Sequence, residues 1–304
     1  MASDRPRRRA SGGGPKARPH PVQRTSGGPK KYVGPKASLE AQRRRNRTLA
    51  YAAVGAAVAV VAVLLLVKAL GGSSTPSATS SVSPAAGVPA PAAITEHLTS
   101  VPLARLAAAP TSGVAAPTAI HDSALVAGGK PDLLFIGAEF CPICATERWA
   151  MYVALSKFGT FTPAPGQIHS AVADEDIATV TFYKTTYTSP YFTFTPVETT
   201  TNQPSNGYYV TLQTPTAAQQ KLWSSHTTQT FPWLDFGGKM QLNSAQFDPS
   251  ELHGMSFQEI ASQVGNNSTV VGGDIDSSAR VLIQTICATL SNHRPANVCR
   301  AVGA

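Results

Sequence analysis

The sequence predicts an α/β fold for most of this 304-residue chain. Segments rich in β-branched and aromatic residues alternate with segments whose apolar residues recur at helical spacing, which is the pattern of α/β proteins. The run PDLLFIGA, residues 131–138, is short and almost continuously apolar. Such a run is typical of a central strand that is buried on both faces of its sheet. We therefore expect an α/β domain built around this strand.

The charge of the chain is unevenly distributed. Residues 1–48 contain 14 Lys or Arg and two acidic residues, whereas residues 49–304 contain 11 Lys or Arg and 15 acidic residues. The overall net charge of +8 therefore describes the N-terminal tail. The tail is punctuated by Pro and Gly and has a single aromatic residue, Tyr32, among its charges, which disfavours nucleic-acid binding. We interpret it as a disordered cytoplasmic tail that rests on anionic lipid headgroups.

An uncharged apolar segment follows the tail. Residues 49–67 contain no charged residue, and a helix of that length at about 1.5 Å per residue spans roughly one hydrocarbon core. Four arginines between Arg43 and Arg47 precede it and only Lys68 follows, so the positive-inside rule places the N-terminus in the cytoplasm. No small-residue cleavage site follows. We expect an uncleaved transmembrane helix over residues 49–70.

The remaining chain divides into a linker and one domain. Residues 71–93 contain only Gly, Ser, Thr, Pro, Ala and Val, a composition that cannot form a core and is typical of a flexible tether. Residues 94–304 are long enough for one substantial domain. By the topology above, this domain is extracytoplasmic.

The first half of the domain contains the apolar strand and its neighbours. Residues 94–108 have a helical pattern interrupted by Pro102, and a helix is expected from Cys141 to Phe158, before Gly159. Residues 177–184 and 191–198 alternate in the manner of strands.

The second half is mainly helical. Thr214 and Pro215 are suited to open a helix that runs through Trp223, and FPWLDFGG, residues 231–238, predicts a strand that ends in a glycine turn. Ser256 and Glu259 have the spacing of a capping box at the start of a helix that Gly265 closes. A last helix is expected around residues 283–290.

The domain contains four cysteines: Cys141, Cys144, Cys287 and Cys299. Cys141 stands where a strand ends and a helix begins, so the partial positive charge of the helix N-terminus favours its thiolate. Cys144 lies one turn later and can attack a mixed disulfide on Cys141. We therefore expect Cys141 to be the attacking thiolate and Cys144 the resolving thiol.

Other interpretations of the cysteines stay open at this point. A structural zinc site usually needs two close pairs of ligands, and Cys287 and Cys299 are separated by 11 residues, which disfavours zinc. The first pair could instead form an inert disulfide that only fixes the start of the helix. Cys287 and Cys299 are expected to form a structural disulfide near the C-terminus, and the alternative is a relay pair that passes electrons to Cys141 and Cys144.

Two segments resemble the thioredoxin superfamily. PDLLFIGAEFCPIC is similar to its active-site strand and helix, and FPWLDFGGKM is similar to the segment that carries its cis-proline. The resemblance implies a thioredoxin-like central sheet flanked by helices, and it makes Pro232 the cis-proline that shapes a peptide groove beside the cysteines. No bound cofactor and no metal are implied, because the cysteine pair carries the electrons.

A narrower resemblance covers about residues 95–300. GAEFCPICATERWAMYVALSKFGTF, TTYTSPYFTFTPVE and the closing cysteine pair resemble an uncharacterised prokaryotic family of membrane-anchored thioredoxin-like proteins, catalogued as a domain of unknown function, DUF929.

The chain departs from the thioredoxin pattern in two respects. Phe135 stands where thioredoxins have a buried acid that helps to deprotonate the second cysteine. Glu139 and Glu147 are nearby acids, of which Glu139 is expected to face solvent. The 87 residues between Cys144 and Pro232 are about twice the usual span and predict an insertion.

These observations lead to two functional expectations. The first is a membrane-tethered extracytoplasmic thiol-disulfide oxidoreductase that acts on cysteines of exported proteins or on a membrane redox partner. The second is a redox-inert thioredoxin-like binding module of the cell envelope with structural disulfides.

Overall fold

The computed structural model describes residues 87–290 and 293–304. The basic tail, the transmembrane helix expected over residues 49–70 and most of the expected linker lie outside these described residues. In the part of the chain that the structure describes, no helix combines the length and apolar character needed to cross a membrane.

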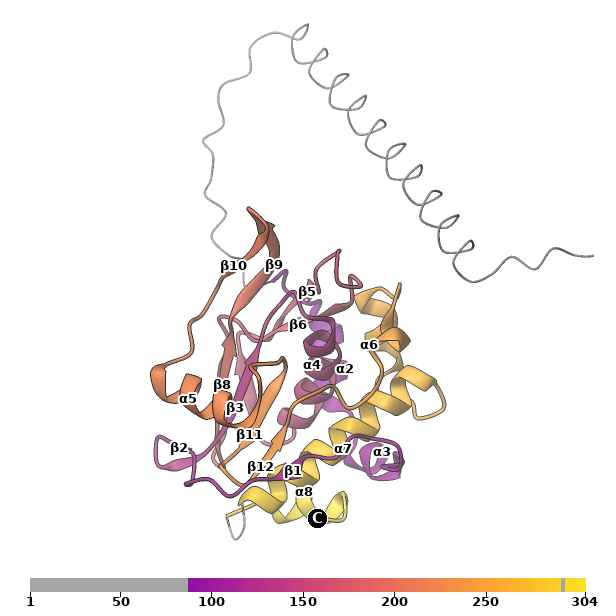
Figure 1. Cartoon of the computed structure of the whole chain (residues 1–304). Helices are drawn as coiled ribbons and strands as arrows, with labels where there is room; N and C mark the ends of the chain where they lie inside the picture. The colour runs from indigo at the N-terminus through magenta and orange to yellow at the C-terminus, as the bar shows by residue number, and fades with distance from the viewer. Residues whose placement is uncertain (1–86, 291–292) are drawn as a thin grey trace, which may run out of the picture. The chain divides into compact units, whose positions relative to one another are not determined.

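The described residues form one six-stranded sheet surrounded by helices (Figure 1). Its strands are β1 (Thr118–Ala119), β2 (Val126–Ala127), β3 (Lys130–Gly137), β8 (Thr193–Glu198), β11 (Trp233–Phe236) and β12 (Met240–Leu242). The order is β1-β12-β11-β3-β2, and β8 pairs with β3 in parallel over residues 132–137. β11 is antiparallel to both β3 and β12. The fold is thus mixed α/β, as the sequence predicts.

β3 is buried on both faces. Leu133 and Phe135 belong to the larger apolar core, whereas Leu134 and Ile136 belong to a second core that contains Trp223. Successive side chains of a strand point to opposite faces, so β3 contributes to both cores. This confirms the prediction of a central strand made from residues 131–138.

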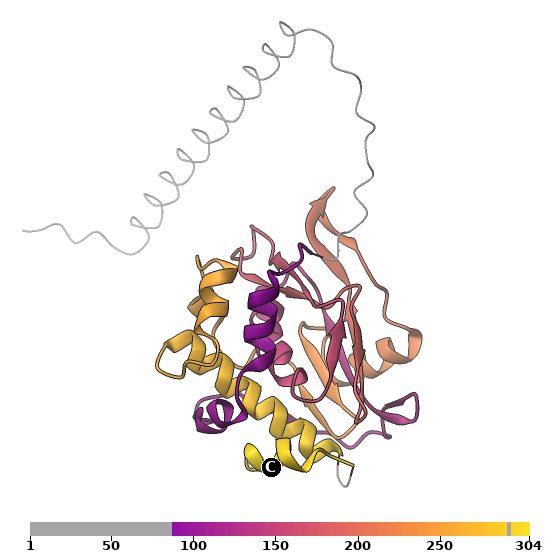
Figure 2. The same ribbon diagram turned by 180° about the vertical axis from the view of Figure 1, so that it is seen from behind.

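Helices cover both faces of the sheet (Figures 1 and 2). One face carries α2 (Ala92–Ser100), α4 (Pro142–Leu155), α6 (Phe257–Gln263) and α7 (Val270–Leu290), and α4 packs against α7. The other face carries α5 (Ala217–His226). The remaining short helices are α3 (Leu103–Ala108), η1 (Pro249–Leu252) and α8 (Ala296–Ala301).

Three two-stranded sheets occupy much of the chain between the cysteine pair and Pro232. Four strands lie between α4 and β8, and they pair as β4 with β7 and β5 with β6. The hairpin of β9 and β10 follows β8. These strands are β4 (Thr160–Thr162), β5 (Gly166–His169), β6 (Ala178–Thr181), β7 (Thr186–Thr188), β9 (Thr200–Ser205) and β10 (Tyr208–Thr211).

Most element boundaries differ little from the expected ones. The helical pattern before residue 108 is split at Pro102 into α2 and α3, and Ser256 caps α6 through a capping box, both as expected. α5 begins later than Pro215, because Thr216 and Gln219 form a capping box of their own. The expected strand over residues 177–184 is shortened to β6.

The folded part also begins before Ile94. The backbone of Val88 forms a bridge with Gln167, and α2 begins at Ala92. The residues just before the expected boundary are therefore attached to the domain and are not part of a free linker.

Candidate functional site

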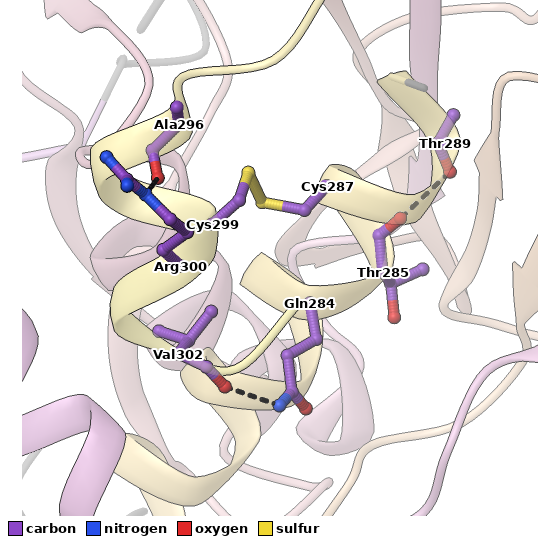
Figure 3. The surroundings of a disulfide bond; sticks show 8 residues. All are labelled: Gln284, Thr285, Cys287, Thr289, Ala296, Cys299, Arg300 and Val302. Carbon is purple, nitrogen blue, oxygen red and sulfur yellow. Dashed lines mark hydrogen bonds between the residues drawn. A yellow bond between two sulfur atoms is a disulfide. The ribbon is translucent and has the colours of Figure 1, made fainter. Parts of the chain in front are cut away.

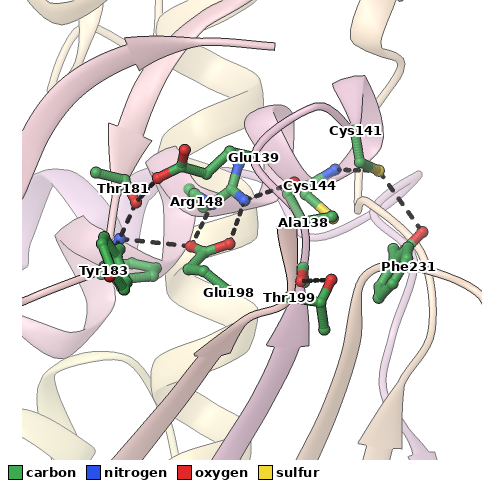
Figure 4. Close-up of polar contacts among 12 residues, drawn as sticks. Ala138, Glu139, Cys141, Cys144, Arg148, Thr181, Tyr183, Glu198, Thr199 and Phe231 are labelled. Atoms are coloured by element: carbon green, nitrogen blue, oxygen red, sulfur yellow. Dashed lines mark hydrogen bonds and ion pairs between the residues drawn. The ribbon is translucent and has the colours of Figure 1, made fainter. Parts of the chain in front are cut away.

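Cys141 is the N-cap of α4. Its backbone is extended, with φ −78° and ψ 121°, and Pro142 occupies the first turn. The backbone N–H of Cys144 donates a hydrogen bond to Cys141 Sγ, with N and S 3.3 Å apart (Figure 4). Both cysteines are free thiols in the structure. A sulfur in this position lies at the unpaired N–H groups of the helix N-terminus, and their partial positive charge favours the thiolate form.

The two thiols differ in acidity. A hydrogen bond from the Cys144 thiol, followed by backbone hydrogen bonds and the charge of Arg148, lowers the pKa of Cys141 in spite of its burial. Burial, followed by the hydrogen bond to Cys141, raises the pKa of Cys144 well above its ordinary value. Of the two thiols, Cys141 therefore ionises more readily and Cys144 less readily than an ordinary cysteine.

The segment that contains Pro232 lies beside the cysteines. The Phe231–Pro232 peptide bond is cis, and the carbonyl oxygen of Phe231 is 4.0 Å from Cys141 Sγ. Phe140, Ile143 and Phe231 pack against the cysteine pair, so that Cys141 is only 6% exposed. The structure thus brings together Cys141, Cys144 and Pro232, although Phe231, the residue before Pro232, is 90 positions from Cys141 in the chain.

Aromatic side chains form a wall next to Cys141. The ring of Phe140 stacks on Tyr209 from β10, with centroids 4.3 Å apart, and meets Phe231 edge to face at 6.2 Å. Phe231 in turn lies 5.1 Å from Trp223 of α5. The β9–β10 hairpin and α5, which follow one another in the chain, therefore both contribute aromatic side chains near the site.

A buried ion pair lies behind the cysteines. Arg148 of α4 donates from Nε and Nη2 to the two carboxylate oxygens of Glu198 over 2.9 and 2.6 Å, and both side chains are fully buried. Nη2 also donates to the carbonyl of Ala138 over 2.8 Å, at the end of β3 (Figure 4). The sequence analysis did not find this pair, because the two residues are 50 positions apart and neither belongs to a motif.

Glu139 is buried, so the expectation that it faces solvent is wrong. Its backbone N–H donates to the carbonyl of Thr200, and its Oε1 accepts a hydrogen bond from Thr181 over 2.6 Å. These contacts turn the residue inward, where its exposed fraction is 3%. Burial, followed by the negative charge of Glu198, raises the pKa of Glu139 to about 7.

Glu147 is also fully buried but has another partner. Its Oε2 accepts a hydrogen bond from the backbone N–H of Gln246 over 3.1 Å.

Phe135, at the position of the thioredoxin acid, packs under Arg148, with the guanidinium carbon 5.8 Å from the ring centroid. A cation over an aromatic face is a favourable contact. At this position the chain therefore has an aromatic ring that contacts the buried Arg148.

Cys287 and Cys299 form a disulfide between α7 and α8, with the Cα atoms 5.7 Å apart (Figure 3). Both are fully buried within the large core, whereas Cys141 and Cys144 belong to a separate apolar cluster. Among the residues that the structure describes, no three His, Cys, Asp or Glu side chains are grouped so as to hold a metal ion.

Comparison with known proteins gives one finding. Residues 117–214 match the family described as Domain of unknown function (DUF929). No curated protein and no solved structure matches the chain. The DUF929 match contains both thiols, Glu139 and the Arg148–Glu198 pair, and it ends before Pro232 and the disulfide.

Proposed function

We propose that this protein is a thiol-disulfide oxidoreductase with a thioredoxin-like fold. The observation that carries the proposal is the pair of free thiols at the start of α4, where the backbone N–H of Cys144 donates to the sulfur of the N-cap residue Cys141. This geometry accompanies a lowered pKa of Cys141 and a raised pKa of Cys144. Thiol-disulfide exchange needs both forms, since the thiolate attacks and the thiol waits to resolve the mixed disulfide.

The reaction proceeds in two exchanges. The Cys141 thiolate attacks one sulfur of a substrate disulfide, a bond forms between Cys141 Sγ and that sulfur, and the other substrate sulfur leaves with the electron pair. Cys144 then attacks Cys141 Sγ, the Cys141–Cys144 disulfide forms, and the substrate departs as a dithiol. The reverse sequence oxidises substrate thiols.

The thioredoxin-like assignment rests on the surroundings of the pair. The cysteines follow the central strand β3, the helix that they begin covers one face of the sheet, and a cis-proline precedes β11 beside Cys141. We assign Pro232 the role of shaping the groove in which a substrate peptide lies. Cys287 and Cys299 are assigned a structural role, because their disulfide is buried away from the thiols.

We further propose that residues 49–70 tether the domain to the cell membrane with the N-terminus in the cytoplasm. The charge-free run and the arginines that precede it support this topology. The substrates are then cysteines of exported proteins or a membrane redox partner, and disulfides persist in that compartment.

One observation favours the second candidate, a redox-inert binding module. Cys141 is almost completely covered by Phe140, Ile143 and Phe231. In a binding module these side chains would stay closed over the sulfur, whereas an oxidoreductase must admit a substrate sulfur to it.

Trapping in cells separates the two candidates. The full chain with Cys144→Ala is expected to accumulate mixed disulfides, seen on non-reducing gels as adducts that a reductant removes. The matched control is the Cys141→Ala, Cys144→Ala double variant, which should form none. If the single variant traps no more than the double variant, the oxidoreductase proposal is rejected in favour of the binding module.

A further inference from the structure

Arg148 lies directly behind the resolving cysteine. It follows Cys144 by four residues on α4, so the two side chains share one face of the helix. Figure 4 shows the guanidinium group beside Cys144, on the side away from Cys141. Both side chains are fully buried. A buried cation next to a buried thiol needs a physical reason, because a charge is costly to remove from water.

One donor of the Arg148 guanidinium group, Nη1, makes no hydrogen bond to a described residue. Nε and Nη2 are occupied by Glu198 and by the Ala138 carbonyl, whereas Nη1 is buried and has no hydrogen-bond partner among the described residues. A buried donor without a partner is uncommon, since it costs free energy. Phe135 supports the group from below, and an aromatic ring neither neutralises the charge nor takes a proton.

We propose that Arg148 is a positioning residue for the resolving step: a buried cation that stabilises the Cys144 thiolate, while Glu198 sets how much of its charge remains for the sulfur. This rests on the proposed function. In that step Cys144 loses its proton and attacks Cys141 Sγ of the mixed disulfide. The bond from Cys141 to the substrate sulfur breaks, and that sulfur leaves with the electron pair and ends with the proton.

The charges around Cys144 determine how readily its thiol ionises. Arg148 is the cation, Glu198 is paired with it, and Glu139 also faces it. Cys141 is neutral once it is in a mixed disulfide. Burial alone would keep Cys144 protonated, and the positive charge of Arg148 acts against that effect. Arg148 thus takes the place of the acid that Phe135 replaces, and it acts through charge where the acid would take a proton.

The resolving step can be followed directly. The full chain, reduced in detergent, is reacted with dithiobis(nitrobenzoate), a symmetric disulfide. Loading of Cys141 breaks this disulfide and releases a first coloured nitrothiobenzoate. Attack by Cys144 on the Cys141 adduct releases a second one, and this second release reports the resolving step. The Cys144→Ala variant is the baseline, because it can form the adduct but cannot resolve it. Loading of Cys141 is measured separately for each variant.

Two substitutions are expected to act in opposite directions. Glu198→Gln leaves the Arg148 charge less neutralised, and release should become several-fold faster. Arg148→Met with Glu198→Leu replaces the ion pair by apolar side chains, which buried pairs tolerate, and release should slow by about tenfold or more at pH 7. The rate of loading should change much less in both. Arg148→Lys retains the charge without the fork and should fall between the double variant and the unchanged chain.

A purely structural role predicts another result. If both substitutions slow release, or if loading and release change equally, the proposal for Arg148 is overturned while the proposed function stands. Thermal unfolding of each variant identifies loss of the fold. If the unchanged chain loads the probe but releases no more thiol than Cys144→Ala, the oxidoreductase function itself fails, and the role of Arg148 with it.

Discussion

The backbone N–H of Cys144 points at Cys141 Sγ over 3.3 Å, so one residue supplies both the second thiol and a hydrogen bond that stabilises the first as an anion. The arrangement follows from two intervening residues, which make the fourth residue of the motif reach back to the N-cap. The reactive sulfur and its partner are thereby linked before any substrate arrives.

Alkylation should reveal this link. In the reduced chain we expect Cys141 to react with iodoacetamide with a midpoint below the ordinary thiol value of about 8.5, because its thiolate is stabilised. Cys144 is fully buried and should not react. Cys144→Ala keeps the backbone N–H but removes the thiol donor, so the midpoint should rise part of the way. Rates measured from pH 4 to 9, with peptide mapping of the labelled cysteine, test this; a midpoint at or above the ordinary value contradicts it.

The same shift makes stability depend on pH. A thiol with a lower pKa in the folded state releases its proton first there, so the reduced chain gains stability as pH rises through that folded value. The gain should be lost on acidification and should be absent from Cys141→Ala. Urea unfolding of the reduced unchanged chain and of Cys141→Ala, measured at pH values from below the folded pKa of Cys141 up to its unfolded pKa, gives the difference in the free energy of unfolding.

Gly137, at the end of β3, leaves room for the ring of Phe135 beneath Arg148. A Cβ on Gly137 would collide with the ring of Phe135, which supports Arg148. Gly137→Ala should therefore destabilise the domain by about 1 to 3 kcal/mol, as overpacking does. Gly273 is a matched control in α7, where a Cβ would make an ordinary 3.6 Å contact with Asn267, and alanine there should add up to about 1 kcal/mol. Equal urea midpoints for the two variants would disprove the steric argument.

The disulfide of Cys287 and Cys299 should matter for stability and not for exchange. Replacing both by alanine opens a loop with a sequence separation of 12 and should cost roughly 3 kcal/mol in the loop-entropy model. Release of nitrothiobenzoate from Cys141 should keep its rate at temperatures where the variant is folded. Loss of that release in a folded variant would instead identify the pair as a relay.

Asp235 of β11 should give stability a dependence on pH with the opposite slope to that of Cys141. Burial is the main cause that raises its pKa to about 6, while its Oδ1 accepts a hydrogen bond from Gly238 over 2.6 Å. Between about pH 4 and 6 the folded state holds a proton that the unfolded chain has lost, so stability falls as pH rises. Asp235→Asn should flatten this slope when unfolding is measured in urea.

An exposed acid provides the contrast. Asp248 caps η1, and its hydrogen bond with the backbone of Ser250 lowers its pKa. Asp248→Asn should remove a contribution that grows as pH rises. If Asp235→Asn and Asp248→Asn change the slope in the same direction, the burial argument for Asp235 is wrong.

The elements of this fold that depend on residues close together in the chain could be predicted from the amino-acid sequence. The apolar run gave β3, Pro142 and Gly159 bracketed the helix after the cysteines, and the Ser256–Glu259 pair marked the start of α6. Pro232 was singled out by the resemblance of FPWLDFGGKM to the segment that carries the cis-proline of the thioredoxin superfamily.

The charged part of the site could not be predicted in this way. α4 is buried all round from Cys144 to Leu155, and it buries Glu147 and Arg148 along with its apolar residues. Helical periodicity assigns charged residues to a solvent face, so it misplaces them in such a helix. Their partners, Glu198 and Gln246, come from distant segments that no spacing rule connects to the cysteines.

The long span between the cysteines and Phe231 has a consequence for the growing chain. Synthesis runs from the N-terminus, so Cys141 emerges 90 residues ahead of Phe231, and Arg148 emerges 50 residues ahead of Glu198. Until these later segments join β3, the motif is an ordinary pair of cysteines without its cover or its ion pair. The cover over Cys141 and the ion pair behind Cys144 are therefore completed only after β8 and the residue before Pro232 have joined β3 and α4.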